Sequence, residues 1–237
     1  MIVVVGMAFE ARIVSSLGIR VVCGGDGKTL QQDLSHAMAA GSSGLISFGV
    51  AGGLAPSLRP GTCVIASSVI DNDVVRHADA RWAQRLARII PGAVSGAILG
   101  VPEPIAHAQT KQALHARTGA FAIDMESHVV ARTAAQHRVP FAAVRVVVDP
   151  VERTIPRAAL AGSQPDGTIS PLAVMRALLR RPGDLFGLIR MTLDARAARG
   201  TLVRGRDLLG PSFGLLEASY KPKAALALEA EPAAVDA

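Results

Sequence analysis

Short apolar runs alternate with amphipathic segments along most of the chain. Runs rich in Val, Ile and Ala, such as residues 45–48 and 141–148, predict buried strands, because a sheet covered on both faces needs apolar side chains at every position. Segments with apolar residues three or four positions apart, such as 80–90 and 126–136, predict helices. This alternation predicts one α/β domain with a parallel or mixed central sheet covered by helices on both faces.

Most of the predicted elements fall before residue 150. The expected strands are residues 2–5, 20–23, 45–48, 63–66, 93–99, 121–123 and 141–148. The expected helices are residues 8–17, 28–40, 80–90, 110–117, 126–136, 172–181 and 184–198. Residues 151–171 contain several Pro and Gly residues and predict a loop-rich stretch. We expect the domain to cover residues 1–212, including the arginine-bearing helices, with a flexible tail over 213–237.

The composition narrows the class of protein. The chain has 237 residues, 50% of them hydrophobic but only 3% aromatic, and a net charge of +6 that comes mainly from arginines late in the sequence. Nucleic-acid binding is disfavoured, because one Trp and one Tyr offer few surfaces for base stacking. Cys23 and Cys63 stand alone in apolar runs and predict buried free thiols. The cysteines and histidines lack metal-ligand spacing, so we expect neither a metal site nor a cofactor.

The start of the chain predicts a cytoplasmic protein. Residues 1–6 are apolar, but no cationic segment precedes them and Glu10 soon follows, so a signal peptide is not expected. No apolar run is long enough to span a bilayer.

Two acids stand where buried strands are predicted to end, at the edge where α/β sheets bind ligands. Asp149 follows the apolar run 146–148, and burial there would raise its pKa, so that a neutral carboxyl could donate a proton to a purine. Glu126 could hold ribose hydroxyls and stabilise positive charge on the sugar ring. The alternatives are that Asp149 begins a turn with Pro150 and that Glu126 is a helix-start acid.

Neighbouring residues extend this candidate site. Met125 could pack against the sugar or fill the core, and Asp124 is expected to cap the following helix. Glu10 could activate a water molecule, although an acid in the first turn of a helix is equally ordinary. The glycines of residues 49–53 would let the backbone approach a ligand, or would serve tight packing between strand and helix.

These motifs, in this order, resemble the purine nucleoside phosphorylase and nucleosidase superfamily. The resemblance covers about residues 1–150 and rests on Glu10, on the loop around Gly49–Leu54, on Asp124–Ser127, and on Arg145 with Asp149. The methylthioadenosine/S-adenosylhomocysteine nucleosidases have a similar glycine loop and Met-Glu motif. A narrower resemblance is to the hopanoid-associated phosphorylases, carried by Met7–Arg12, Ile123–His128, the arginine-rich helices and Arg181–Gly183.

The resemblance implies a fold and roles for individual residues. It implies a three-layer α/β/α phosphorylase/hydrolase-like fold with a mixed central sheet, and a homo-oligomer. Asp149 then corresponds to the purine-protonating acid and Glu10 to the water-activating glutamate. Glu126 corresponds to the ribose-binding glutamate and Met125 to the methionine that packs on the ribose. The remaining substrate-binding positions that it implies are Gly49, Val50, Ala51, Gly52 and Ile123.

Two departures leave the nucleophile open. Ser47 stands where related phosphorylases place an arginine for phosphate, and Val50 stands where Ser or Thr is usual. Inorganic phosphate could still act as a co-substrate held by Arg12, Arg145 or Arg76, so phosphorolysis and hydrolysis both remain.

The substrate also has alternatives. The hopanoid resemblance implies adenosylhopane, a membrane lipid, and would give the basic amphipathic segments over 172–198 a role at the inner membrane surface. On periodicity alone these segments are ordinary packing helices with a solvated arginine face. A soluble methylthioadenosine/S-adenosylhomocysteine nucleosidase and a non-catalytic nucleoside-binding protein are the other interpretations.

Overall fold

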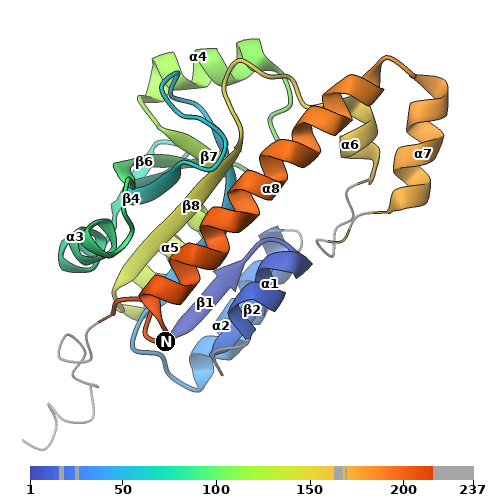
Figure 1. The fold of residues 1–237 in the computed structure, drawn as a ribbon. Coiled ribbons are helices and arrows are strands. Elements are labelled where there is room, and N and C mark those ends of the chain that lie inside the picture. Colours follow the sequence, from blue (N-terminus) through green and yellow to red (C-terminus); the bar gives the residue numbers. More distant parts are fainter. Residues whose placement is uncertain (16–18, 25–26, 163–167, 169, 216–237) are drawn as a thin grey trace, which may run out of the picture.

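The centre of the structure is a mixed sheet, to which eight strands of the described part of the chain belong (Figure 1). The computed structural model describes residues 1–15, 19–24, 27–162, 168 and 170–215. The strands are β1 (Ile2–Val5), β2 (Arg20–Cys23), β3 (Leu45–Gly53), β4 (Cys63–Asp71), β5 (Val74–His77), β6 (Val94–Gly100), β7 (Ala122–Asp124) and β8 (Phe141–Asp149).

Five of the described strands close into a ring. β3 pairs with β8, β8 with β4, β4 with β6, β6 with β7, and β7 again with β3. β1 and β2 extend the sheet outward from β3, and β5 adds an antiparallel strand to β4. Because β1, β3 and β8 run parallel, their carboxyl ends lie at one edge of the sheet.

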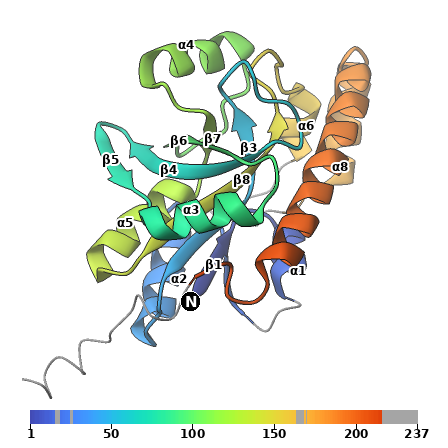
Figure 2. The ribbon, with the colours of Figure 1, turned by 60° about the vertical axis from the view of Figure 1, so that its left-hand side comes forward.

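Helices cover both faces of the sheet. α2 and α5 pack on one face, while α1, α3 and the second half of α8 pack on the other (Figures 1 and 2). The three-layer α/β/α arrangement expected from the sequence is therefore confirmed. The described helices are α1 (Ala8–Ser15), α2 (Gly27–Ala39), α3 (Ala80–Ile89), α4 (Ala108–Thr118), α5 (Ser127–His137), α6 (Arg157–Gly162), α7 (Pro171–Arg180) and α8 (Asp184–Leu209).

The structure differs from the sequence expectations in five elements. The glycine segment 49–53 is not a loop, because β3 continues through it and stays paired with β8. β4 extends five residues beyond its expected end, to Asp71, because it pairs with β5, a strand that the sequence analysis did not predict. The short helix α6 lies inside the stretch that we expected to be loop, and α8 continues eleven residues past 198.

The last described residues belong to the core. Phe213 is fully buried, its ring meets that of Phe48 edge-on at 5.2 Å between centroids, and its carbonyl accepts a 2.8 Å hydrogen bond from the Trp82 indole. The expected domain boundary at residue 212 therefore has to move past Phe213. The rest of the expected tail, residues 216–237, lies outside the described residues.

α7 and the first half of α8 project from the sheet (Figure 1). None of the residues of α7, all of them described, is buried, and the first buried residue of α8 is Ala198. Among the described residues, no helix has the length and hydrophobicity needed to cross a membrane.

Candidate active site

The strand ends gather the predicted acids at one edge of the sheet. Asp149 is the last residue of β8, and Glu126 follows β7 as the residue before α5. Glu10 comes from the first turn of α1, just after β1. The register of the ring places Gly52 of β3 opposite both Ile123 and Asp149, which brings these parts of the chain together.

Arg145 is the centre of the first group of charges. Its side chain is completely buried, and its Nε lies 2.5 Å from an oxygen of Asp124. Its Nη2 donates hydrogen bonds to Oε2 of Glu126 at 3.0 Å and to the Ser47 hydroxyl at 2.5 Å. Its Nε also donates to the Ser127 hydroxyl at 3.3 Å. An arginine inside an apolar strand needs such partners, because burying an unpaired charge costs several kcal/mol of free energy. This cost is comparable to the free energy of unfolding of a whole small domain.

Asp124 has two structural roles. Its carboxylate accepts hydrogen bonds from the backbone N–H and hydroxyl of Ser127, the first residue of α5, although the N-cap residue of this helix is Glu126. Its ion pair with Arg145 was not expected, since the sequence analysis considered Arg145 only as a phosphate ligand. The sequence feature that could have indicated a buried ion pair is the single arginine within the apolar run 141–148.

Glu10 is held by backbone amides. Its Oε1 accepts a 2.7 Å hydrogen bond from Val50 N–H, and its Oε2 accepts bonds from Gly6 N–H at 2.8 Å and Met7 N–H at 2.9 Å. The residue is 1% exposed. Glu10 thus joins the end of β1 to the glycine segment of β3, and its carboxylate lies against Arg145.

The group holds more acid than base. Three carboxyls, those of Glu10, Asp124 and Glu126, share the single charge of Arg145. Burial raises the pKa of Glu126 to about 7, although Arg145 opposes the shift. Burial likewise raises the pKa of Glu10 against the opposing effects of Arg145 and the backbone amides. The group therefore retains a proton more readily than free carboxylates would.

Two glycines allow this close packing. A Cβ on Gly6 would lie 2.5 Å from Oε1 of Glu126, and a Cβ on Gly49 would lie 2.5 Å from Oε1 of Glu10 and 2.7 Å from Nη1 of Arg145. Neither position has room for a side chain without moving the acids.

Asp149 belongs to a second, simpler group. Its Oδ2 accepts a 2.7 Å hydrogen bond from Nζ of Lys111, which also donates to the carbonyl of Pro150 at 2.8 Å. Lys111 is completely buried, whereas the side chain of Asp149 is 12% exposed. Burial raises the pKa of Asp149, and Lys111 acts against that rise. The carboxyl as a whole lies beside Gly52, where a Cβ would be 3.4 Å from Oδ1 and 3.5 Å from Oδ2.

Lys111 was missed by the sequence analysis. It lies on α4, and it reaches Asp149 only because α4 packs across the end of the ring. One feature of the sequence could have indicated that Lys111 faces inward: it lies three residues before Leu114 on the helix, and Leu114 packs on the small apolar cluster beneath α4.

The remaining predicted substrate-binding residues line the same edge. Ala51 and Ile123 are buried, while Val50, Gly52 and Met125 are partly exposed. The backbone of Val50 is already engaged, since its N–H donates to Glu10 and its carbonyl accepts from Arg145.

The candidate phosphate ligands do not converge. Arg12 is exposed on α1, where its Nε donates to the carbonyl of Ala8. Arg76 lies on β5 and pairs with Asp71. Arg145 is held by the acids described above.

A cavity of about 190 Å³ lies beside Asp149. Its other walls come from the segment after β8 and from the first half of α8, so the projecting helix forms one side of it. The residues that line it are Asp149, Arg153, Thr154, Ile155, Pro156, Phe186, Gly187, Arg190, Met191 and Asp194.

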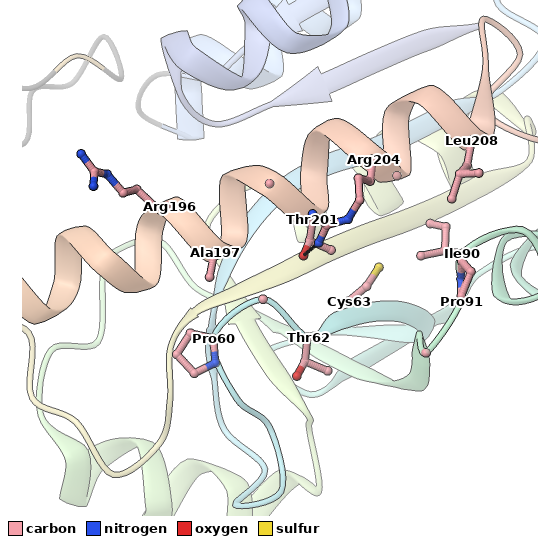
Figure 3. Close-up of a pocket in the computed structure, with 14 residues that line it drawn as sticks. Pro60, Thr62, Cys63, Ile90, Pro91, Arg196, Ala197, Thr201, Arg204 and Leu208 are labelled. Atoms are coloured by element: carbon pink, nitrogen blue, oxygen red, sulfur yellow. Dashed lines mark hydrogen bonds between the residues drawn. The ribbon is translucent and has the colours of Figure 1, made fainter.

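A larger cavity, of about 660 Å³, lies under the second half of α8 (Figure 3). Thr62 and Cys63 lie on its strand side and Thr201 and Arg204 on its helix side (Figure 3). Burial raises the pKa of the Cys63 thiol to about 12, so the thiol stays protonated near neutral pH. This cavity contains none of the acids at the strand ends, so the cavity beside Asp149 is the candidate active site.

Comparison with known proteins assigns the family. The model of the Phosphorylase superfamily matches residues 5–164, which include every acid and cation of the two groups. The chain belongs to this superfamily and is an enzyme of the phosphorylase and nucleosidase class. Among curated proteins, none matches the chain significantly.

Solved structures support the same fold. The 5′-methylthioadenosine/S-adenosylhomocysteine nucleosidase of Neisseria meningitidis, in complex with methylthio-immucillin-A, is 17% identical over 90% of this chain and 98% of its own, with a TM-score of 0.59. A putative methylthioadenosine nucleosidase of Weissella paramesenteroides is 18% identical over 88% and 98%, with a TM-score of 0.58. The futalosine hydrolase of Helicobacter pylori is 16% identical over 62% and 87%, with a TM-score of 0.56.

Proposed function

We propose that the chain cleaves the N-glycosidic bond of an adenine nucleoside. The observation that carries the proposal is the pairing of two unlike acid groups at one edge of the sheet. Asp149 has a raised pKa, one of its oxygens is fixed by Lys111, and its carboxyl lies beside Gly52. Protonated Asp149 gives its proton to N7 of adenine while the bond between N9 and C1′ breaks, and adenine leaves as a neutral base.

The group around Arg145 serves the sugar in this proposal. Glu126 accepts hydrogen bonds from the ribose hydroxyls, and Met125 packs against the ring. The excess negative charge of the group stabilises the cationic sugar that forms as the bond breaks. Because this charge is fixed by Arg145 and by the backbone bonds of Glu10, it needs no rearrangement during the reaction.

We further propose that water is the nucleophile. The guanidinium of Arg145 already serves Asp124, Glu126 and Ser47, and a phosphate dianion would add charge to a group that holds three acids and one arginine. Glu10, with its raised pKa, accepts the proton of the water molecule that attacks C1′, giving a free ribosyl product.

The substrate that we favour is an adenosyl lipid, adenosylhopane, converted to adenine and ribosylhopane at the cytoplasmic surface of the inner membrane. Its support is the resemblance of the N-terminal segment and the arginine-rich helices, together with the exposed apolar side chain of Phe186 at the Asp149 cavity.

The test is product analysis. Purified protein is incubated with adenosylhopane in detergent, with and without phosphate, and the products are identified by mass spectrometry. Adenine with free ribosyl lipid in both reactions is the expected result. A phosphorylated ribosyl lipid that forms only with phosphate would overturn the hydrolytic step, and no adenine in either reaction would overturn the lipid substrate.

A soluble methylthioadenosine/S-adenosylhomocysteine nucleosidase is the second candidate. It is favoured by the extent of the structural likeness, which covers 98% of the Neisseria meningitidis enzyme. Release of adenine from methylthioadenosine, at a rate that adenosylhopane neither matches nor inhibits, would establish this candidate instead.

We also propose a homo-oligomer, on the resemblance alone. Sedimentation equilibrium of the purified chain over a range of concentrations tests it, and a monomer at all of them would contradict it.

A further inference from the structure

One part of the molecule has apolar side chains that the fold does not cover. Seven large apolar side chains of α7 and the first half of α8 are between 50% and 79% exposed. On α7 they recur at the helical spacing i, i+3 and i+7, and on α8 at i, i+4 and i+8, so each helix presents one apolar stripe outward. We call this surface the hairpin face; its apolar residues are Leu172, Met175, Leu179, Leu185, Phe186, Ile189 and Leu193.

The charges around these stripes have one sign. Residues 171–199 contain six arginines and two acids, Asp184 and Asp194. Both acids are used inside the fold, because Asp184 accepts the backbone N–H of Ala158 and Asp194 pairs with Arg153. The arginines beside the stripes are exposed, and these are Arg176, Arg180, Arg181, Arg190, Arg196 and Arg199.

We infer that the hairpin face is a docking surface for an anionic lipid bilayer. An apolar stripe flanked by arginines suits the boundary between head groups and acyl chains, where both kinds of side chain are satisfied at once. A second copy of the same face would bring unpaired arginines together, which opposes self-association. Seven exposed large apolar side chains on two successive helices are unusual for a protein without a partner there.

The hairpin face adjoins the active site. Phe186 and Arg190 belong both to the hairpin face and to the wall of the cavity beside Asp149. Docking would therefore place the opening of that cavity at the membrane surface, where a lipid-linked substrate is present. This last step rests on the proposed function, whereas binding to the bilayer does not.

Vesicle binding of the full chain tests the inference. The chain is sedimented at low ionic strength with vesicles of phosphatidylcholine alone and of phosphatidylcholine with phosphatidylglycerol. Binding to the anionic vesicles, lost with added salt, is expected. Equal binding to both, or no binding to either, would overturn the inference.

Charge variants locate the surface. The triple variant Arg176→Gln/Arg180→Gln/Arg181→Gln should lower the vesicle partition coefficient about 100-fold, since each basic residue near an anionic surface contributes a factor of roughly five. The matched control removes three exposed arginines from α3, Arg81→Gln/Arg85→Gln/Arg88→Gln, and should retain near-normal binding. An equal loss in the control would mean that net charge alone drives binding and would contradict the assignment.

Apolar variants test insertion. Leu172→Gln/Leu179→Gln should lower partitioning at least about tenfold, because two exposed leucines lose their apolar contact with the bilayer. Val74→Gln/Val75→Gln, on β5, is the matched control for exposed apolar side chains and should bind normally. Sedimentation equilibrium without lipid gives the rival outcome: a dimer that the Leu172→Gln/Leu179→Gln variant dissociates would show that the hairpin face joins two copies, and would overturn the inference.

The activity of the same variants separates the two proposals. Hydrolysis of a soluble adenine nucleoside should be unchanged in Leu172→Gln/Leu179→Gln, while turnover of adenosylhopane in anionic vesicles should fall with binding. Vesicle binding without cleavage of any adenine nucleoside would leave docking standing and remove the proposed function.

Discussion

The two acid groups at the edge of the sheet differ in how their charges are balanced. Around Arg145, three carboxyls share one buried cation, and the group is tied to the backbone of β3 and to the start of α5. At the end of β8, Asp149 faces one buried lysine, and the pair borders a cavity. The comparison shows that the number of charged neighbours sets the environment of a carboxyl, and under the proposed function this difference suits the first group to a cationic sugar and the second to proton donation.

The largest expected effect is on activity and comes from replacing the acid of the Asp149 group. Asp149→Asn keeps the shape of the side chain but removes the proton, so adenine release should fall about 10²- to 10⁴-fold. Steady-state kinetics measures the fall, and thermal unfolding, with binding of a nucleoside inhibitor, checks that the site remains formed. Turnover within a few-fold of the unaltered enzyme would refute the role of the acid.

Removing the buried cation of the other group, Arg145, should lower the free energy of unfolding. Arg145→Met leaves Glu10, Asp124 and Glu126 buried together without a positive charge. We expect a loss of about 3–5 kcal/mol in the free energy of unfolding, the usual result of removing one partner of a buried ion pair. Urea denaturation measures it. Lys111→Met is the control, and it should cost less, because the single acid that it leaves can take up a proton.

The variant Lys111→Met also tests the comparison through the pH dependence of activity. Lys111 lowers the pKa of Asp149 against the effect of burial, so Lys111→Met should raise that pKa further. In the proposed mechanism Asp149 acts in its protonated form, so the alkaline limb of kcat/KM should move to higher pH. A purely structural role for Lys111 would lower activity without moving this limb.

The smallest effect is a change in how stability depends on pH. The folded protein holds the proton of Glu126 up to about pH 7, whereas the unfolded chain releases it near 4.5. The stabilisation from this proton is fully present below pH 4.5 and is lost as pH rises through about 7. Glu126→Gln removes the effect, so the stability of the variant relative to the unaltered protein should increase between these pH values in denaturation curves. A constant difference would show that Glu126 titrates normally.

The sequence indicated the acids better than it indicated their partners. Asp149 and Glu126 could be placed because each follows an apolar strand, and strand ends meet at one edge in a parallel arrangement. Their partners come from distant parts of the sequence: Lys111, which contacts Asp149, lies 38 positions earlier, on a helix. Only the packing of α4 on the ring reveals that pairing.

The strands show a similar division. The long runs that form β3 and β8 were predicted because their residues are apolar throughout. The extension of β3 through its glycines was not predicted, because glycine has a low strand propensity. Pairing of Gly49 and Gly52 with β8 overrides that propensity. β5 was missed because its residues are exposed and show no buried pattern.

The closure of the strand ring has a consequence for motion. β3 and β7 join through only two residue pairs, Gly52 with Ile123 and Gly53 with Ala122, whereas β3 and β8 join through eight, with one register shift between Ala51 and Gly52. A short seam needs the least free energy to separate, so its amide hydrogens should exchange with solvent sooner than those between β3 and β8. This seam flanks Asp149. Under the proposed function, the strand pairing beside the purine would therefore separate more readily than the pairing beneath the ribose.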